Sequence, residues 1–473
     1  MTLLKRLTAV ATLAIMGVMT PDSGRADLFN PEVFTLDNGM TVAVIENNRA
    51  PVVTHMIWYK VGSIDEPPGK SGIAHFLEHL MFKGTEKIAP GEYSRIIRSN
   101  AGEDNASTSY DFTNYFQSIH RDKLGMLMEL EADRMLNLRL SDEVVLPERD
   151  VILDERRQRI DRNPGAQLSV SIDHAMLPNS AYGRPIIGWE HEMEELTTQD
   201  ALDWVQRWYG PNNAIVVVAG DTTVEEVRAL AEQHYGPIPP RDDLPTRVVT
   251  EIPPLTGTIR IDKVDERVKQ PEVRLMYLGP CRGNSEPEEF LALDIFQEAF
   301  SEGASSKMYR ELVVKRKMAT AGGLYHWSWR RNACQSTLYG SPADGHTLEE
   351  LEAALQEVLA EVLEEGLTEE QVRRAVRQLK ITSTFARDSV HGPAYWVGQT
   401  LVLDADLRGL EDSAEIMDSL TAEDVMRVAR KYYDQPPRVI ATLQGPPAVT
   451  QATADKADTD TATTDTDSAG ENQ

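Results

Sequence analysis

The sequence predicts an α+β protein built from two homologous α/β halves. Three observations lead to this prediction. Along the 473 residues, segments rich in β-branched side chains alternate with segments of helical periodicity. A proline-rich stretch divides the chain near its middle, and the pattern of segments before this stretch recurs after it. We therefore expect one half over 27–240 and the other over 255–447.

The first half should open with strands. Two segments rich in Val, Thr and Ile, 33–45 and 52–61, read as two strands around a turn at 46–48. Further along, 213–220 (NAIVVVAG) is a continuous β-branched run and is expected to be a buried strand. Residues 222–235 then have the periodicity of an amphipathic helix.

Six prolines lie between Pro237 and Pro254, so no packed helix can run through this stretch, and we expect a linker over 241–254. A helix N-cap pattern, a helix ending in two aromatic residues and a β run follow Leu196, and the same series follows Leu420, 224 residues later. A second N-cap pattern at Leu140 recurs 227 residues later, at Leu367. Two matches in the same order at nearly one offset indicate an internal duplication.

The two chain ends differ from the halves. Residues 1–26 follow a secretory signal pattern, with Lys5 and Arg6, an apolar stretch over 7–19 and an expected cleavage after Ala26. The apolar stretch is shorter than the roughly 20 residues of a membrane-spanning helix, although an uncleaved anchor is an alternative. We expect an exported, periplasmic protein with no stable membrane span after cleavage. At the other end, 448–473 should form a disordered acidic tail.

Composition excludes some partners. The chain has 75 acidic residues against 48 Lys and Arg, a formal net charge of -27, so phosphate backbones repel it and nucleic acid is not expected as a partner. Its two cysteines, Cys281 and Cys334, are too few for a disulfide scaffold and fit no Cys-x-x-Cys motif. An exported protein can form a bridge between them, but the spacing alone leaves both states open.

One predicted helix carries the residues of a metal site. Residues 71–84 combine Ser71 as the expected N-cap, good helix formers and a terminating glycine. The apolar residues share one face and should form the core stripe: Ile73, Phe76, Leu77 and Leu80. On the opposite face, His75 and His79 can each give a nitrogen to one Zn²⁺, and Glu78 between them can take a proton from water. The alternative is a helix that happens to carry two histidines on a solvated face.

A catalytic zinc ion needs a third protein ligand. The segment 146–156 places Pro147 at an expected first helical position, and Glu148 and Glu155, seven residues apart, project from one face of that helix. One of the two can bind the metal while the other hydrogen-bonds a ligating histidine. A charged, solvent-facing helix is the alternative that composition allows.

The His-x-x-Glu-His order and the later glutamates resemble the pitrilysin/insulinase family of zinc peptidases. The resemblance is to its small-subunit members in particular, such as the mitochondrial processing peptidase β subunit and bacterial processing-type peptidases. It includes LDNG at 36–39, GIAHFLEHLMFKGT at 72–85 and NASTSYDFT at 105–113, and extends over nearly all of 30–447. It implies two homologous halves, each with an antiparallel-rich sheet packed with helices.

The resemblance also implies roles for individual residues. The implied ligands of one zinc ion per chain are His75, His79 and Glu155, with Glu78 as the general base and Glu148 as a supporting carboxylate. The implied substrate-binding residues are Asn105, Ala106 and Ser107, on an exposed edge strand to which an extended peptide adds as a further strand.

The second half departs from the family pattern. Relatives carry an Arg, followed seven residues later by a Tyr, as a second peptide-recognition element, and here Val313 and Thr320 stand at these positions. No His-x-x-Glu-His occurs after the linker. An aliphatic side chain cannot replace a bidentate guanidinium, so we expect a heterodimer with a related subunit that supplies both groups. In the alternative, Arg310, Lys315 or Arg316 takes over and a homodimer suffices.

The predicted function is therefore that of a zinc-dependent endopeptidase acting on oligopeptides or unfolded segments, as one subunit of a dimeric chamber. A non-catalytic scaffold or binding subunit of a family heterodimer is the alternative, but such a subunit has no need of an intact set of ligands and base. Metal buffering would predict His-rich tracts, whereas the ten histidines are scattered.

Overall fold

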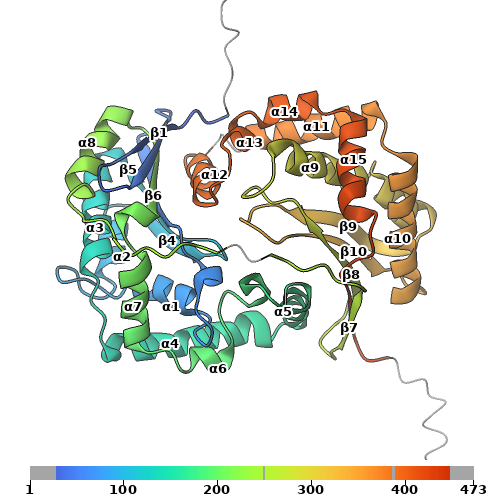
Figure 1. Cartoon of the computed structure of the whole chain (residues 1–473), viewed down its shortest axis with the longest axis horizontal. Coiled ribbons are helices and arrows are strands. Elements are labelled where there is room, and N and C mark those ends of the chain that lie inside the picture. The colour runs from blue at the N-terminus through green and yellow to red at the C-terminus, as the bar shows by residue number, and fades with distance from the viewer. Residues whose placement is uncertain (1–27, 249–250, 386–388, 448–473) are drawn as a thin grey trace, which may run out of the picture.

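The computed structural model describes residues 28–248, 251–385 and 389–447. The predicted signal peptide and acidic tail lie outside these residues. The described chain forms two β-sheets, each with its own set of helices, that lie side by side (Figure 1). No helix within the described ranges is both long and apolar enough to cross a membrane.

The first sheet has six strands in the order β1-β2-β6-β3-β5-β4, all antiparallel except the β2–β6 pair. The strands are β1 (Glu32–Thr35), β2 (Thr41–Glu46), β3 (Val52–Tyr59), β4 (Glu103–Thr108), β5 (Thr113–His120) and β6 (Ala214–Gly220). The prediction of a single strand over 33–45 is wrong. Gly39 has a φ of 87° and closes a turn in which the Leu36 N–H donates to the Met40 carbonyl, so this segment forms two paired strands.

The second sheet repeats this arrangement. Its five strands lie in the order β7-β11-β8-β10-β9, and only β7 and β11 are parallel. They are β7 (Ile259–Val264), β8 (Glu272–Gly279), β9 (Ala319–Trp327), β10 (Cys334–Pro342) and β11 (Val439–Gln444). If β1 is left out, the strand order of the first sheet is the same as that of the second sheet. The parallel pair, β2 with β6 and β7 with β11, also takes the same position in both sheets. The predicted fold class, with its two homologous halves, is confirmed.

The described ranges contain fifteen α-helices. In the first half they are α1 (Ile73–Leu80), α2 (Glu92–Ser99), α3 (Leu124–Asn137), α4 (Asp142–Arg156), α5 (Pro164–Met176), α6 (Glu190–Met193), α7 (Thr198–Trp208) and α8 (Val224–His234). In the second half they are α9 (Pro287–Ser301), α10 (Leu348–Glu365), α11 (Glu369–Phe385), α12 (His391–Val402), α13 (Arg408–Glu411), α14 (Ser413–Ser419) and α15 (Ala422–Tyr433). The helices α7 and α15 begin with the same capping box, Thr197 with Asp200 and Thr421 with Asp424, as the repeat predicts.

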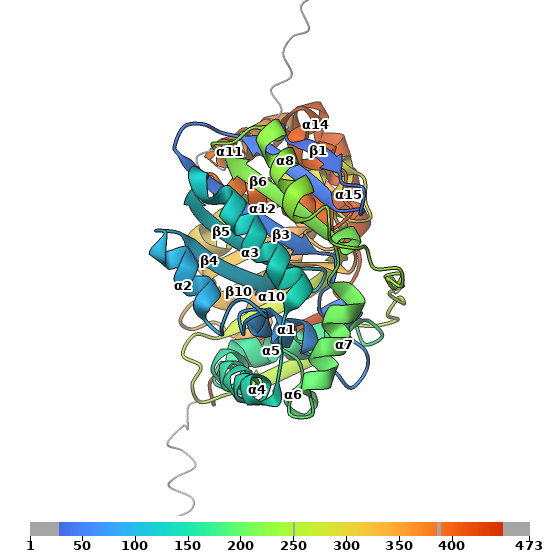
Figure 2. The ribbon, with the colours of Figure 1, turned by 90° about the vertical axis from the view of Figure 1, so that its left-hand side faces the viewer.

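In each half, helices cover one face of the sheet of that half, and one further helix packs against the sheet of the other half. On the outer face of the first sheet lie α3 and α8 (Figure 2). The opposite face packs against α12 of the second half, where Gly398 lies so close to Trp58 that an added Cβ would be 2.2 Å from the indole nitrogen. In return, α5 of the first half packs Leu168 and Ile172 against β11 of the second sheet. Buried contacts on both faces thus hold the halves together.

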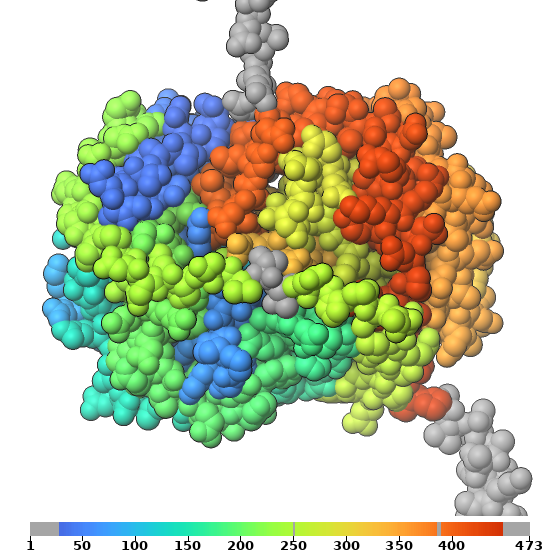
Figure 3. Space-filling model, in the orientation of Figure 1, coloured from blue at the N-terminus to red at the C-terminus, as the bar shows by residue number. Residues whose placement is uncertain are grey.

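The linker crosses the surface from one half to the other (Figure 3). Its described residues form no helix or strand. Arg247 anchors it to the first half through a bidentate ion pair with Asp65, at 2.9 and 3.0 Å, and a hydrogen bond to the Asp111 carbonyl. The guanidinium is buried, so both carboxylate bonds are made in a site with little competing water.

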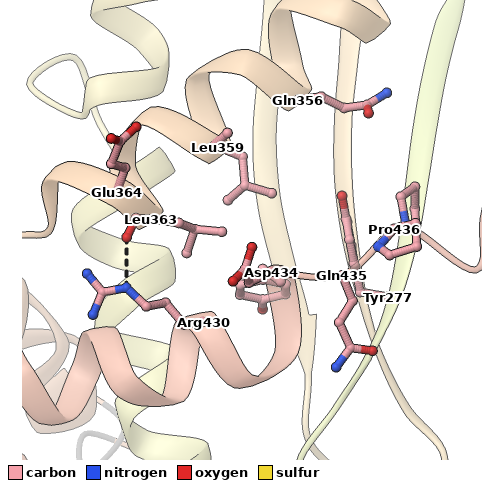
Figure 4. A pocket seen from close by; sticks show the side chains of 12 residues that line it. Tyr277, Gln356, Leu359, Leu363, Glu364, Arg430, Asp434, Gln435 and Pro436 are labelled. Carbon is pink, nitrogen blue, oxygen red and sulfur yellow. Dashed lines mark hydrogen bonds between the residues drawn. The ribbon is translucent and has the colours of Figure 1, made fainter.

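The halves differ at the ends of α7 and α15. In the first half, the chain after α8 crosses the end of α7, where Ile238 is buried and the Arg241 side chain donates to the Tyr209 carbonyl. At the end of α15, residues 254–257 lie near Tyr432 and Pro436. A cavity of about 570 Å³ lies there, between Tyr433 and the α10 residues around Leu363 (Figure 4).

Cys281 and Cys334 are paired, with their Cα atoms 5.4 Å apart. This answers the question that the sequence left open. We expect titration of the denatured, unreduced protein to detect no free thiol, and titration after reduction to detect two. Two reactive thiols before reduction would contradict the pairing.

Candidate metal centre

The helix that carries the two histidines begins one residue later than the sequence suggests. Its N-cap is Gly72, with a φ of 88°, so the prediction of Ser71 as N-cap is wrong. The Ser71 hydroxyl instead accepts the Trp189 N–H, and the carboxylate of Glu66 accepts the Ala74 N–H at 3.1 Å. Glu66 is buried, and burial raises its pKa to about 8. The side chain of Glu66, which lies outside the helix, therefore accepts one of the N–H groups at the start of the helix that have no partner within it.

The two faces of α1 are divided as predicted. Ile73, Phe76, Leu77 and Leu80 are buried in the first core. The helix ends at Leu80, earlier than expected, and Gly84 lies in the following turn with a φ of 105°. His75 is buried and His79 half-buried on the opposite side, toward α4.

The helix α4 supplies both glutamates. It begins at Asp142 with Ser141 as N-cap, so the prediction that Pro147 occupies a first helical position is wrong. Pro147 lies inside the helix, where its missing N–H forgoes one backbone hydrogen bond. Glu148 and Glu155 nevertheless project toward α1, because a spacing of seven residues is close to two helical turns.

Three side chains converge on one point. The Glu155 Oε2 atom lies 3.8 Å from His75 Nε2 and 3.5 Å from His79 Nε2. One ligand atom from each of the three residues lies within 4.8 Å of the others. Ligand atoms about 2 Å from a common tetrahedral zinc ion are about 3.3 Å apart. Two imidazoles and a carboxylate at these separations fit a zinc ion.

Glu148 orients His79 for this arrangement. Its Oε1 atom accepts a hydrogen bond of 2.8 Å from His79 Nδ1, and its other oxygen pairs with Lys83. The hydrogen on Nδ1 leaves the Nε2 lone pair directed at the shared point. Although burial lowers the pKa of His79, the hydrogen bond to Glu148 and the nearby carboxylates raise it above its ordinary value. A metal ion would therefore compete with a proton at Nε2.

His75 is prepared differently. Burial, followed by the positive charges of His79 and Arg159, lowers its pKa to about 3. Its imidazole is neutral at any pH at which the protein is expected to work, which is the state that binds metal.

Glu78 lies beside the convergence point without joining it. Its Oε2 atom accepts a hydrogen bond of 2.6 Å from the Thr108 hydroxyl. Burial raises its pKa, against the opposing effects of the Thr108 hydrogen bond and the charge of His79. A carboxylate whose pKa is raised holds a proton more readily than an ordinary one, which suits a group beside a metal site that must accept and return a proton.

The convergence point opens into a cleft of about 800 Å³. Its walls come from α1, the start of α5, the end of α4 and β4. Asn105, Ala106 and Ser107 of β4 line it, and β4 is the last strand of its sheet. The described residues place no strand on the outer side of β4, so that edge has backbone groups available for another chain.

Sequence reasoning missed three side chains of this site. Lys83 and Arg159 each lie four residues after a predicted site residue, His79 and Glu155, and this helical spacing was the available signal. Thr108 belongs to the predicted edge strand, but its contact with Glu78 depends on how β4 packs against α1.

In the second half, the residues that replace the expected Arg and Tyr have local contacts. Val313 is half-buried against the second core, and the Thr320 hydroxyl donates to the Ser341 carbonyl at 3.3 Å. Two of the three nearby cations are also engaged, since Lys315 pairs with Glu311 and Arg316 with two glutamates of α10.

Comparisons with known proteins show the family of the chain. The family model described as insulinase (peptidase family M16) matches residues 41–189, and the one described as peptidase M16 inactive domain matches residues 195–379. The zinc protease PqqE of Helicobacter pylori is 30% identical over 435 residues, which span 91% of this chain and 96% of that protein.

Solved structures show the same fold. The crystal structure of a protease from Helicobacter pylori superimposes with a TM-score of 0.81 at 29% identity, covering 88% of this chain and 99% of the other. The first half of the periplasmic protease PqqL from Escherichia coli matches with a TM-score of 0.76 at 18% identity, covering 93% and 98%. Sequence, topology and ligand geometry agree, and the chain belongs to the pitrilysin/insulinase family of peptidases, peptidase family M16.

Proposed function

We propose that this chain is the catalytic subunit of a zinc-dependent endopeptidase that cleaves oligopeptides or unfolded segments. The observation that carries the proposal is the convergence of His75, His79 and Glu155 on one point, with Glu78 beside it, in an open cleft. The naming of a relative at 30% identity as a zinc protease supports the choice of metal.

The three ligands would hold one zinc ion per chain. When bound, zinc supplies Lewis-acid chemistry that polarises a carbonyl and makes water more acidic. Glu78 takes a proton from the attacking water and returns it to the leaving amine. Glu148 keeps the tautomer of His79 that points Nε2 at the metal.

The edge strand β4 would hold the substrate. An extended peptide that pairs with it through backbone hydrogen bonds has its register fixed without a requirement for particular side chains. Asn105, Ala106 and Ser107 lie along the same cleft as Glu78, so a peptide added there passes the proton-transfer residue.

We further propose that the chain is exported to the periplasm and works as a heterodimer with a related subunit. The N-terminal sequence pattern supports export. The local engagement of Val313, Thr320, Lys315 and Arg316 supports the need for a partner that carries the Arg and Tyr. Arg310 is the remaining cation that could serve a homodimer.

The test is hydrolysis of a quenched peptide library by the processed chain, alone and mixed with a related subunit. We expect activity to appear on mixing, to be lost after chelation and to return with zinc. It should fall when the partner's recognition Arg is changed to Ala. The control is the same mixture with a chain that carries Arg310→Ala, which should remain active.

The outcomes separate the alternatives. If the chain alone forms a homodimer and hydrolyses peptides as fast as the mixture does, the heterodimer is contradicted, but the proposal of a zinc endopeptidase stands. Absence of hydrolysis in every zinc-loaded mixture would favour the scaffold or binding subunit.

A further inference from the structure

A hairpin of the second half reaches the first half beside the metal cleft. It joins β9 to β10 and consists of residues 328–333. Its tip contacts the turn that follows β4, residues 109–112. The last residue of β4 is Thr108, whose hydroxyl donates to Glu78 at 2.6 Å. The hairpin therefore contacts the first half directly after the end of β4 that lies next to the proposed base.

Two backbone N–H groups of the hairpin bind side chains of the first half. The Arg331 N–H donates to Oδ2 of Asp111 at 3.2 Å, and the Asn332 N–H donates to the Tyr182 hydroxyl at 3.2 Å. That hydroxyl in turn donates to Oδ1 of Asp111 at 2.7 Å. Asp111 has an exposed fraction of 1%, so these hydrogen bonds are made in a site with little competing water. They fix the turn against the hairpin.

The guanidinium of Arg330 lies over two aromatic rings of the first half. Its Cζ atom is 4.4 Å from the centre of the Tyr110 ring and 5.5 Å from that of the Tyr182 ring. Both rings are buried, and burial strengthens the attraction between a cation and an aromatic face. Burial also raises the pKa of Asp173 of α5, and the charge of Arg330 opposes this effect. One side chain of the second half thus interacts with the turn after β4 and with α5, both of which line the metal cleft.

The second half holds the hairpin in one conformation. The N–H groups of Arg282 and Gly283 donate to the carbonyls of Ser328 and Arg330, at 2.9 and 3.2 Å. A Cβ atom added to Gly283 would lie 2.5 Å from the Cα atom of Arg331, so the two segments pack backbone against backbone.

The disulfide fixes the chain directly after the hairpin. Cys334 is bonded to Cys281, which precedes the segment that packs on the hairpin. Ala333, the last residue of the hairpin, has a φ of 59°, a region that residues with a Cβ atom rarely adopt. Such a conformation persists where the surrounding structure imposes it, and it is enriched at functional sites. The hairpin is therefore a preorganised part of the second half.

We propose that Arg330 is a positioning residue for peptide binding, which holds the turn at 109–112 and, through it, the end of the edge strand β4. The inference rests on the proposed function, because it gives the second half a part in forming the strand along which the substrate pairs. Arg330 need contact neither the peptide nor the metal ion. Its loss should weaken peptide binding more than it slows the chemical step, because backbone pairing along β4 contributes alike to the bound substrate and to the transition state.

Hydrogen exchange of the processed chain, with zinc added, tests the contact between the halves without turnover. We expect Arg330→Ala to speed exchange of the protected amides over 103–112 about tenfold, because the turn loses its cation–π contacts and opens more often. Amides of β6 in the same sheet should exchange as in the parent chain, which excludes a general loss of stability. Arg330→Lys keeps the charge but not the planar group, and should have an intermediate effect.

Kinetics in the active form, the mixture or the chain alone, test the consequence for the substrate. Arg330→Ala should raise KM for a quenched peptide about tenfold, keep kcat within about threefold and leave the zinc content per chain unchanged. The matched control is Arg331→Ala, whose backbone N–H can still donate to Asp111. The lost side chain pairs with Asp404, which keeps its ion pair with Lys60, so KM and exchange should both match the parent chain.

Tyr182→Phe examines the same turn from the first half. It keeps the ring beside Arg330 but removes the hydroxyl that joins Asn332 to Asp111. Combined with Arg330→Ala, it should raise KM by less than the product of the two single effects, because both substitutions release one turn. A full product would mean that the two side chains act on the substrate by separate routes.

Unchanged exchange over 103–112 in Arg330→Ala, or faster exchange with an unchanged KM, would overturn the inference. Failure of the proposed function would look different. In that case the parent chain hydrolyses no peptide in any form, while exchange over 103–112 still depends on Arg330. The contact between the halves then stands, and its role in substrate binding falls.

Discussion

Glu78→Gln is expected to keep the metal ion and to lower peptide turnover by about 10² or more. The amide has nearly the shape of the carboxylate and can still meet the Thr108 hydroxyl, but it cannot accept the proton of the attacking water. Proton transfer by a positioned base contributes about 10² to 10⁴ to a rate. The measurement is kcat on a quenched peptide, together with zinc content per chain.

The matched control for this substitution is Thr108→Val, which removes the hydrogen bond to Glu78 but leaves the carboxylate. It should lower turnover less than Glu78→Gln, since the base itself remains. Near-normal turnover by a zinc-loaded Glu78→Gln protein would show that another group moves the proton.

His79→Ala and Glu155→Gln are expected to lose the zinc ion itself, and with it all measurable hydrolysis. Each removes or weakens one of three ligands, and a catalytic zinc site has no protein ligand to spare. Zinc content after dialysis against a weak chelator is the decisive measurement, because it separates these variants from Glu78→Gln, which should remain loaded.

Glu148→Gln should have a smaller effect on zinc affinity than the substitutions of the ligands. It weakens the hydrogen bond that orients His79 but removes no ligand, so zinc affinity should fall by about 10 to 100-fold rather than vanish. Thermal unfolding of each apo variant should match that of the apo parent. If Glu155→Gln bound zinc as tightly as the parent chain, Glu155 would not be the third ligand.

The central part of the candidate metal site could be predicted because its residues are close together in the sequence. His75, Glu78 and His79 lie within two turns of one helix, so their common face follows from helical periodicity. The third ligand could not be chosen this way. Spacing placed Glu148 and Glu155 on one face of α4, but only family resemblance distinguished them, and the structure places Glu155 beside both Nε2 atoms and Glu148 beside Nδ1.

The three incorrect predictions of local structure, for the strand over 33–45, the N-cap of α1 and the start of α4, have identifiable causes. Asn38-Gly39 is a recognised hairpin signal, and giving it weight would have divided the strand predicted over 33–45. The cap of α1 could not be found locally, because the group that accepts the Ala74 N–H is Glu66. Pro147 looked like a helix start because proline favours that position, yet the helix tolerates it in its second turn.

Other features depend on contacts between segments far apart in the chain. The pairing of Cys281 with Cys334 required their Cα positions, and the contact of Thr108 with Glu78 required the packing of β4 on α1.

The reciprocal placement of α5 and α12 has the form of a domain swap carried out within one polypeptide. Two separate copies of a half-length ancestor could bury these faces only by associating, with a stability that depends on their concentration. Fusion through a linker makes the association intramolecular, so the exchange persists at any dilution. Fusion also makes the two halves depend on each other. The helix α5 belongs to the first half, where it is a wall of the metal cleft, and its apolar face is covered by the second sheet. The second half is therefore needed to hold this wall, although it carries no metal motif of its own.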